Sequence, residues 1–379
     1  MSSLALETAA APAHWGRLGR RGALLAGALA VVAGVAVLAG ARFGLMLAIG
    51  LGFGITLEAL RFGFAGPWRA MILRRQPAGI LAQLLAIALV ASVAIPLLQS
   101  HSTELAGAAA PIGWAMVGGA FVFGVAMQVV LGCGSGTLVN AGSGNPVSLL
   151  ALPFFAIGSF LGAEHLLWWT GLGSLPVVVL KGTSGLLVTL ALLAVVAGLL
   201  LWFAAPGARR LPKRYVAAAL ILAALAIGNL LVSGQPWGVV YGLGLWVAKG
   251  AAAVGLDPGA AGFWAAPGNA TRLGGSILTD YTSLTNLGLI AGAFLVAAWK
   301  DGGLSTRLPR LPARAWVATI VAGLLLGYSA RLAFGCNVGA FFSGISTGSL
   351  HGWAWFAAAF AGSRVGIDLR PRLGLEVRA

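Results

Sequence analysis

Long apolar runs recur along the whole chain and limit what it can fold into. Clear examples are residues 22–40, 78–98 and 184–204, each about 20 residues long, which is the length that an α-helix needs to cross a hydrocarbon core. The apolar residues run continuously and do not alternate, so a helical membrane protein is favoured over a β-barrel. The sequence is 59% hydrophobic and 9% charged, whereas a soluble domain carries roughly 25% charged residues. We therefore expect an all-α polytopic membrane protein.

The apolar runs also predict the internal organisation. We expect roughly nine to eleven membrane segments, some of them re-entrant or broken helices. The stronger segments lie near 22–40, 43–57, 78–98, 112–131, 147–163, 184–204, 215–233, 237–254, 283–299, 315–334 and 350–368, with a weaker one at 166–180. The expected parts are an N-terminal tail (1–21), a first half (22–204), a basic linker (205–215), a second half (216–370) and a C-terminal tail (371–379).

The net charge of +15 predicts orientation rather than nucleic-acid binding, because the basic residues lie mainly between the apolar runs. By the positive-inside rule these basic groups, including the one at the C-terminus, belong on the cytoplasmic side, and the loop around His101 and Glu104 faces outside. The first apolar run carries no cleavage signature and is expected to be a retained helix. The two cysteines form no CxxC pair and show no metal-ligand spacing, so we expect no metal and no cofactor.

The stretches 118–136 and 321–339 resemble each other. A shift of 203 residues aligns Gly124 with Gly327, Gly132 with Gly335, Cys133 with Cys336 and Gly136 with Gly339. One extra residue then aligns Gly144 with Gly348, Gly158 with Gly362 and Ser159 with Ser363. Chance explains poorly a shared GCxxG between apolar runs of matched length. We therefore expect two pseudo-symmetric halves with inverted topology.

Both GCxxG segments are too rich in glycine and polar residues for a helix that faces lipid. Lipid cannot satisfy free backbone N–H and C=O groups, so irregular backbone at membrane depth needs protein or a water-lined path around it. We expect each segment to break a helix and to direct half-helix ends inward, where N-termini favour an anion. Tight helix packing is the alternative, and we expect it to explain most of the 57 glycines.

Several stretches resemble the YeeE/YedE family of membrane proteins. They are GCGSGTLVNAGSGN (132–145), QPWGVVYGLGLWVAKG (235–250), LTDYTSLTNLGLIAGAF (278–294), ARLAFGCNVGAFFSGISTGSLHGWAWF (330–356) and GSRVGIDLRP (362–371). They follow the family order, and the resemblance runs from about residue 43 to residue 372. It implies a bacterial inner-membrane protein. In the characterised branch it implies thiosulfate uptake, with path cysteines that hydrogen-bond transiently to the anion.

The resemblance places Cys133 and Cys336 on that path but departs at a third position. The family pattern RFCFAGAFR stands here as RFGFAGPWR (61–69), with Gly63 in place of the cysteine. This departure leaves open whether the substrate is thiosulfate. The expected substrate path comprises Cys133, Cys336, Gly132, Gly134, Gly136, Gly335, Asn337 and Gly339.

Thiols suit such a path chemically. A thiol is a weak donor on a soft sulfur, and a permeating ion must bind well enough to enter and weakly enough to leave. An apolar environment keeps the thiol protonated, so that it does not repel an anion. The alternative is that each cysteine is simply a small buried apolar residue.

Further polar residues are candidates for supporting roles. Ser135 and Asn145 either share in anion binding or bond between helices. Arg331 is an intramembrane charge that either attracts the anion or extends to the cytoplasmic face. Lys249 forms either a structural pair with Asp280 or part of a vestibule. Two other side-chain expectations are a mutual neutralisation of Glu58 and Arg61 and a packing role for His351.

The expected function is therefore uptake of a small inorganic sulfur anion, most directly thiosulfate. The alternatives are transport of another sulfur or selenium compound, or a membrane thiol–disulfide enzyme, which the isolated apolar cysteines disfavour. A nucleotide site at 132–144 is excluded because the flanking strand and βαβ unit are missing. Apart from membrane lipid, the expected partner is a separate cytoplasmic sulfur-transfer protein.

Overall fold

The computed structural model describes residues 13–260, 262–300 and 309–376, and all regular elements in these ranges are helices. They are α1 (Ala13–Ala39), α2 (Ala41–Ala59), α3 (Ala65–Arg74), α4 (Ala78–Ser100), α5 (Trp114–Val130), α6 (Gly134–Gly142), α7 (Pro146–Glu164), α8 (Leu166–Thr170), α9 (Gly182–Trp202), α10 (Lys213–Ser233), α11 (Val240–Ala253), α12 (Gly262–Ala265), α13 (Pro267–Gly274), η1 (Ile277–Thr279, 3-10), α14 (Tyr281–Trp299), α15 (Ala313–Leu332), η2 (Asn337–Phe342, π), α16 (Ser343–Ser346) and α17 (His351–Arg372). Helix α1 begins well before residue 22, where the first half was expected to start. Part of each expected tail, 1–12 and 377–379, lies outside the described residues.

Nine helical segments among the described residues are long and apolar enough to cross a membrane. Two of them, Trp114–Gly142 and Ala313–Ser346, join a long helix to a shorter helical continuation. These are the two segments that contain the cysteines. The prediction of an all-α polytopic membrane protein with broken helices is confirmed.

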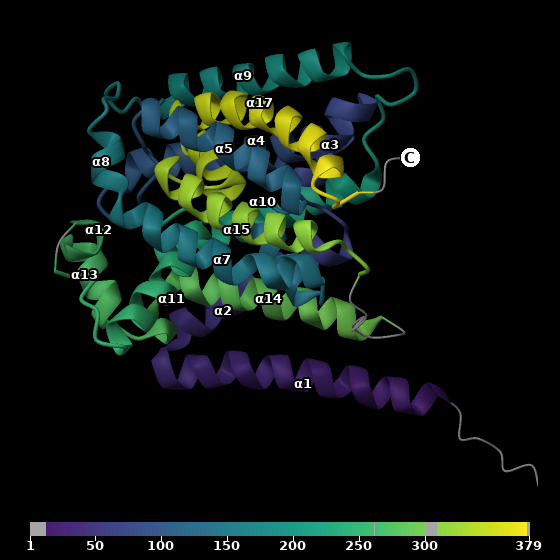
Figure 1. Cartoon of the computed structure of the whole chain (residues 1–379), viewed down its shortest axis with the longest axis vertical. Coiled ribbons are helices and arrows are strands. Elements are labelled where there is room, and N and C mark those ends of the chain that lie inside the picture. Colours follow the sequence, from purple (N-terminus) through teal and green to yellow (C-terminus); the bar gives the residue numbers. More distant parts are fainter. Residues whose placement is uncertain (1–12, 261, 301–308, 377–379) are drawn as a thin grey trace, which may run out of the picture.

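The long helices run between two ends of the molecule (Figure 1). One end, here called the basic side, holds Arg75 at the end of α3 and the Glu58–Lys300 ion pair of 3.0 Å between the ends of α2 and α14. The other end, the loop side, holds residues 101–113 between α4 and α5. Helix α4 joins the two, since it begins just after Arg75 and ends at His101. In Figure 1, α3 and the C-terminus lie on the right and α8, α12 and α13 on the left.

Four inner helices pack in two reciprocal pairs, α5 against α17 and α7 against α15. Small residues let membrane helices approach closely, and each pair has glycines whose backbone lies against a carbonyl of the partner, with no room for a Cβ. The contacts are Gly124 with Ala359, Gly327 with Phe155, Gly158 with Leu324 and Gly362 with Phe121. Under the alignment of the two GCxxG segments, the contact of Gly124 with Ala359 corresponds to that of Gly327 with Phe155. In the same way, the contact of Gly158 with Leu324 corresponds to that of Gly362 with Phe121. The packing therefore supports the expected repeat.

The breaks after α5 and α15 have the same backbone geometry. Leu131 and Phe334, which are related by the same shift, both adopt left-handed backbone with φ of 54° and 57°, a conformation that costs a non-glycine residue roughly 1–2 kcal/mol. The next residue closes each helix with an N–H···O=C bond: Gly132 N donates to Met127 O (3.1 Å) and Gly335 N donates to Ala330 O (2.8 Å). Each cysteine follows immediately, so the chain turns at both sites just before the thiol.

A third irregular stretch, residues 234–239 between α10 and α11, passes beside these breaks. Free carbonyls at membrane depth need protein donors, and buried side chains supply them here. Ser343 Oγ donates to Trp237 O (2.7 Å), Asn286 Nδ2 to Val239 O (2.9 Å) and Ser159 Oγ to Val240 O (2.9 Å). The bond from Ser343 holds this stretch against the second cysteine segment, and Val239 also adjoins the first, since a Cβ at Gly134 would lie 3.5 Å from Val239 Cγ1.

Candidate functional site

Cys133 caps the N-terminus of α6. Its sulfur accepts a hydrogen bond from Gly136 N at 3.3 Å and lies 3.4 Å from Ser135 Oγ. Its own carbonyl accepts from Thr137 N (2.8 Å) as the first bond of the helix. The thiol therefore sits where the free N–H groups and positive end of a half-helix meet.

Cys336 occupies the matching place before η2. Its carbonyl accepts from Ala340 N at 2.8 Å. Its surroundings differ, because Val338 stands where the first segment has Ser135, and no side-chain capping bond forms. Next to it, Asn337 is fully buried, and neither its Oδ1 nor its Nδ2 has a hydrogen-bond partner.

The two segments touch at Gly134 and Cys336. A Cβ at Gly134 would lie 2.6 Å from Cys336 Sγ and 3.1 Å from its Cβ, so only glycine leaves room for the thiol in this position. Both cysteines are free and buried. The sequence predicted that the two GCxxG segments belong to one site, and the structure places them in direct contact.

A cavity of about 200 Å³ opens on the basic side of this contact. Cys133, Ser135 and Gly136 line it from α6, and Gly63 lines it from the turn before α3. A Cβ at Gly63 would meet no atom within 4 Å. The carbonyl of Gly63 accepts from Gln83 Nε2 at 2.9 Å, which holds the turn in place and leaves the Cα side open to the cavity.

A second cavity, of about 270 Å³, lies on the loop side. Gly335 and Gly339 line it from the second cysteine segment, and residues 107–110 line it from the loop. Arg331, which was weighed as an anion-attracting residue, also lines this cavity and so does not extend to the basic side. Neither Gly134 nor Cys336 lines either cavity, although their chain neighbours line one or the other. Their contact therefore lies between residues that line one cavity and residues that line the other.

Other candidates have different contacts. Asn145 caps α7 through its Oδ1, which accepts from Ser148 N at 3.1 Å. Lys249 donates to the carbonyls of Leu273 and Gly275, and neither Asn145 nor Lys249 lines the two cavities.

Two expected charge pairs are replaced by others. Asp280 pairs with Arg272 at 2.5 Å rather than with Lys249, and Glu58 pairs with Lys300 rather than with Arg61. No group of three or more His, Cys, Asp or Glu that could hold a metal occurs within the described ranges.

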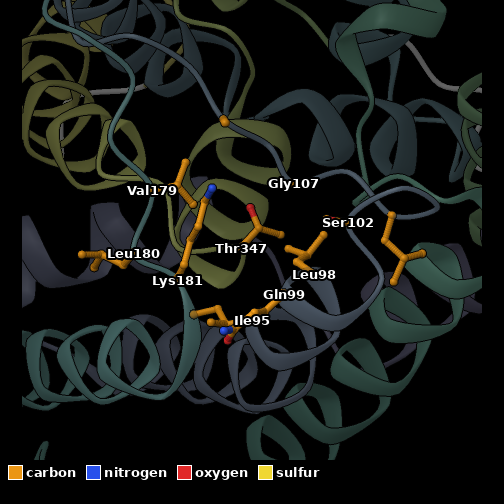
Figure 2. A pocket seen from close by; sticks show the side chains of 11 residues that line it. Ile95, Leu98, Gln99, Ser102, Gly107, Val179, Leu180, Lys181 and Thr347 are labelled. Carbon is orange, nitrogen blue, oxygen red and sulfur yellow. The ribbon is translucent and has the colours of Figure 1, made fainter.

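A larger cavity of about 480 Å³ adjoins the second one on the loop side, and Gly107 and Ala109 line both. Figure 2 shows its wall, formed by the end of α4, the stretch before α9 and Thr347. Its one cationic side chain is the exposed Lys181, and no cysteine lines it.

Tyr241 is a site residue that the sequence analysis did not single out. It lines the loop-side cavity at the start of α11, beside Arg331. Tyr241 lies within 235–250, one of the stretches that carry the family resemblance. Its place in that stretch was the one sequence feature that could have indicated a role at the site.

Comparison with known proteins decides the family. A family model described as sulphur transport matches residues 60–365. The chain belongs to this sulphur transport family.

Named relatives of this family member are transporters. The chain is 27% identical over 332 residues to the thiosulfate transporter TsuA of Spirochaeta thermophila, covering 81% of this chain and 92% of that protein. It is 41% identical over 95 residues to the probable transporter YedE of Escherichia coli and 36% identical over 127 residues to that of Salmonella typhimurium. These last matches span only 23% and 31% of the YedE proteins. The family supports membrane transport of sulfur compounds rather than enzymatic activity.

Proposed function

We propose that this protein takes up thiosulfate through the membrane, from the loop-side cavity to the basic-side cavity past Cys336 and Cys133. The observation that carries the proposal is the contact between Gly134 and Cys336. It lies between residues that line the two cavities, each cysteine stands at a helix break, and the sulfur of Cys133 accepts a backbone N–H bond there. The likeness over 81% of the chain to a protein named as a thiosulfate transporter supports the choice of substrate.

The path offers an anion only weak donors at this point. Neutral thiols and amides bind an anion without a strong charge, so the ion can leave as readily as it enters. The unpartnered amide of Asn337 adds a further donor next to Cys336. The narrow contact excludes a continuous aqueous pore, so passage requires Cys336 and its neighbours to move aside.

The membrane potential opposes such uptake. Moving an anion inward against an inside-negative potential costs roughly 2.3 kcal/mol per charge per 100 mV. The cost for a dianion is therefore about twice as large. Uptake requires a coupled ion gradient or rapid consumption inside. A cytoplasmic sulfur-transfer protein that accepts the anion at the basic-side cavity provides this rapid consumption.

We propose a bacterial inner membrane location with the basic side and the C-terminus in the cytoplasm. Accessibility of a C-terminal tag in intact cells tests this orientation, and labelling from outside contradicts it.

Uptake of labelled thiosulfate into cells that lack their own route tests the function. Cys133→Ala and Cys336→Ala are each expected to lower uptake at least about tenfold, which corresponds to about 1.4 kcal/mol. Cys133→Ser and Cys336→Ser retain a donor and are expected to keep more activity. The matched control is Ser92→Ala on an exposed face of α4, where the hydroxyl bonds only to Ala88 O. Normal uptake in both alanine variants refutes the thiol path.

Another sulfur or selenium anion is the second candidate, and one observation favours it. Gly63 leaves open space in the basic-side cavity where the family resemblance expects a thiol. Competition by unlabelled sulfur and selenium oxyanions in the same uptake assay ranks the candidates. A competitor that outcompetes thiosulfate and is itself accumulated would replace it as the substrate.

A further inference from the structure

Three buried polar atoms around the loop-side cavity have no hydrogen-bond partner within residues 13–260, 262–300 and 309–376. They are Arg331 Nε, Tyr241 Oη and His351 Nε2, and all three residues line the cavity. They come from α15, α11 and the start of α17. Buried polar groups are normally satisfied, so three unpaired atoms around one cavity indicate a missing ligand.

Arg331 carries the strongest indication. Its guanidinium packs over Phe263 (4.8 Å to the ring centroid) and Tyr241 (5.5 Å). Its polar contact is a long one, from Nη2 to Ser159 Oγ at 3.4 Å. Among the residues that the structure describes, no carboxylate lines the cavity, and the nearby Asp280 is already paired with Arg272. Within the described part of the chain, Arg331 has no ion-pair partner.

A half-buried cation without a counter-charge is unfavourable, because desolvation of the charge is not compensated. Stacking on aromatic rings offsets part of this cost, but it leaves the Nε–H group of the guanidinium without an acceptor among the described residues. An anion in the cavity would supply both the charge and the acceptors. The planar fork of arginine donates in pairs to the oxygens of a carboxylate, phosphate or similar oxyanion.

His351 and Tyr241 are suited to complete such a site. His351 is buried, and its Nδ1 lies 2.7 Å from Ser349 Oγ. When the Ser349 hydroxyl donates to Nδ1, the ring proton resides on Nε2, which becomes a donor for a ligand. The hydroxyl of Tyr241 is a third donor. The packing role expected for His351 therefore leaves its Nε2 unexplained, because only Nδ1 has a hydrogen-bond partner among the described residues.

We propose that Arg331, Tyr241 and His351 form a binding site for a tetrahedral sulfur oxyanion in the loop-side cavity, before the ion reaches Cys336. The oxygens of the anion bind these three donors. A terminal sulfur, where the anion has one, points to the cysteine segment that lines the same cavity through Gly335 and Gly339. This orientation rests on the proposed function, whereas oxyanion binding itself does not.

The site and the cysteines then select for different properties. The three donors recognise oxygens and charge, which sulfate and thiosulfate share. The soft thiols recognise the terminal sulfur, which sulfate lacks. Sulfate is therefore expected to bind in the outer cavity and to compete with the transported ion without being transported itself.

The test uses the full chain purified in detergent, with both cysteines replaced by alanine, and measures sulfate and thiosulfate binding by calorimetry at constant ionic strength. Arg331→Gln is expected to raise both dissociation constants at least about tenfold, and Arg331→Lys less, because an ammonium lacks the fork. Tyr241→Phe and His351→Gln are expected to change them about threefold. The matched control is Lys181→Gln, which removes an exposed cation from the neighbouring cavity, and a change under twofold is expected.

Two results overturn the proposal: unchanged affinity in Arg331→Gln, or an equal loss in Lys181→Gln, which would indicate only a general surface charge. Thermal unfolding checks that each variant is folded. If Arg331→Gln does not fold, Tyr241→Phe decides, and unchanged affinity in that variant overturns the site. The double alanine background separates this proposal from the thiol path. Arg331-dependent binding with no thiosulfate uptake in cells refutes the proposed function and leaves the oxyanion site standing.

Discussion

The two cysteine segments begin with the same backbone turn, but an α-helix follows Cys133 and a π-helix follows Cys336, and the neighbouring side chains differ. Both turn through a left-handed residue and place a cysteine at a helix break. Around Cys133 the neighbours are Gly134, Ser135 and Thr137, whereas around Cys336 the same positions hold Asn337, Val338 and Ala340. Small polar groups surround the thiol of Cys133, which lines a cavity, whereas the thiol of Cys336 is fully buried.

This difference shows how a repeated backbone can build an asymmetric path. Gly134 has no side chain because Cys336 Sγ occupies that space. Asn337, at the position matching Gly134, keeps a side chain whose polar atoms are unpaired. The first segment therefore leaves space at Gly134 for the thiol of Cys336, and the second segment provides the unpaired amide of Asn337 as a hydrogen-bond donor. The following substitutions test this division, from the largest expected effect to the smallest.

Gly134→Ala is expected to reduce uptake most, to near background. The new Cβ would lie 2.6 Å from Cys336 Sγ, so the thiol must leave its position between the cavities. Uptake of labelled thiosulfate, normalised to the amount of folded protein in the membrane, measures the effect. Gly118→Ala, on an exposed part of α5 with no atom within 4 Å of the new Cβ, should transport normally. Equal uptake in the two variants would show that the contact does not control passage.

Asn337→Leu is expected to stabilise the protein and slow transport together. The change removes two unsatisfied buried polar atoms at similar volume, which is worth about 1–3 kcal/mol in the free energy of unfolding. Uptake is expected to fall about tenfold if the amide bonds to the passing ion. The unfolding temperature in detergent and the uptake rate check the two halves of this prediction. A destabilised variant would mean that the amide already has a partner.

Ser135→Val makes the first segment resemble the second. The thiol of Cys133 loses its neighbour at 3.4 Å, and one hydrogen bond of about 1 kcal/mol corresponds to roughly a fivefold decrease in uptake. The reverse change, Val338→Ser, places a hydroxyl beside Cys336 and serves as the paired variant. If both changes lower uptake equally, the asymmetry of the two segments has no role in passage.

Gly63→Cys is expected to have the smallest effect, an increase in thiosulfate uptake of about twofold from one additional weak donor. The side chain enters open space in the basic-side cavity, so the fold should not change. Gly63→Ala fills the same space without a thiol and is the control. A similar gain in the alanine variant would assign the effect to cavity shape or backbone stiffness.

Much of the fold could be predicted from the sequence because its signals are local. Apolar runs of membrane-spanning length predicted the helices, and the GCxxG pair predicted where two of them break. Helix α1 begins at Ala13, before the apolar run at 22–40, because a helix can extend beyond its apolar part. The capping role of Asn145 was open to prediction, because Asn precedes Pro146 at the start of α7 and its partner, Ser148 N, is three residues away. The role of Lys249 was not, because its partners lie near the end of α13.

The sequence by itself determined the membrane class, the paired glycine–cysteine segments and the resemblance to a transport family. Only the tertiary structure decided that Gly134 lies against Cys336, that two cavities meet at this contact, and that Arg331 faces one of them without an ion-pair partner among the described residues. The physical reason is distance along the chain. Hydropathy and helix breaking depend on neighbouring residues, whereas a cavity and its unpaired donors arise where segments about 200 residues apart pack together, which no local pattern encodes.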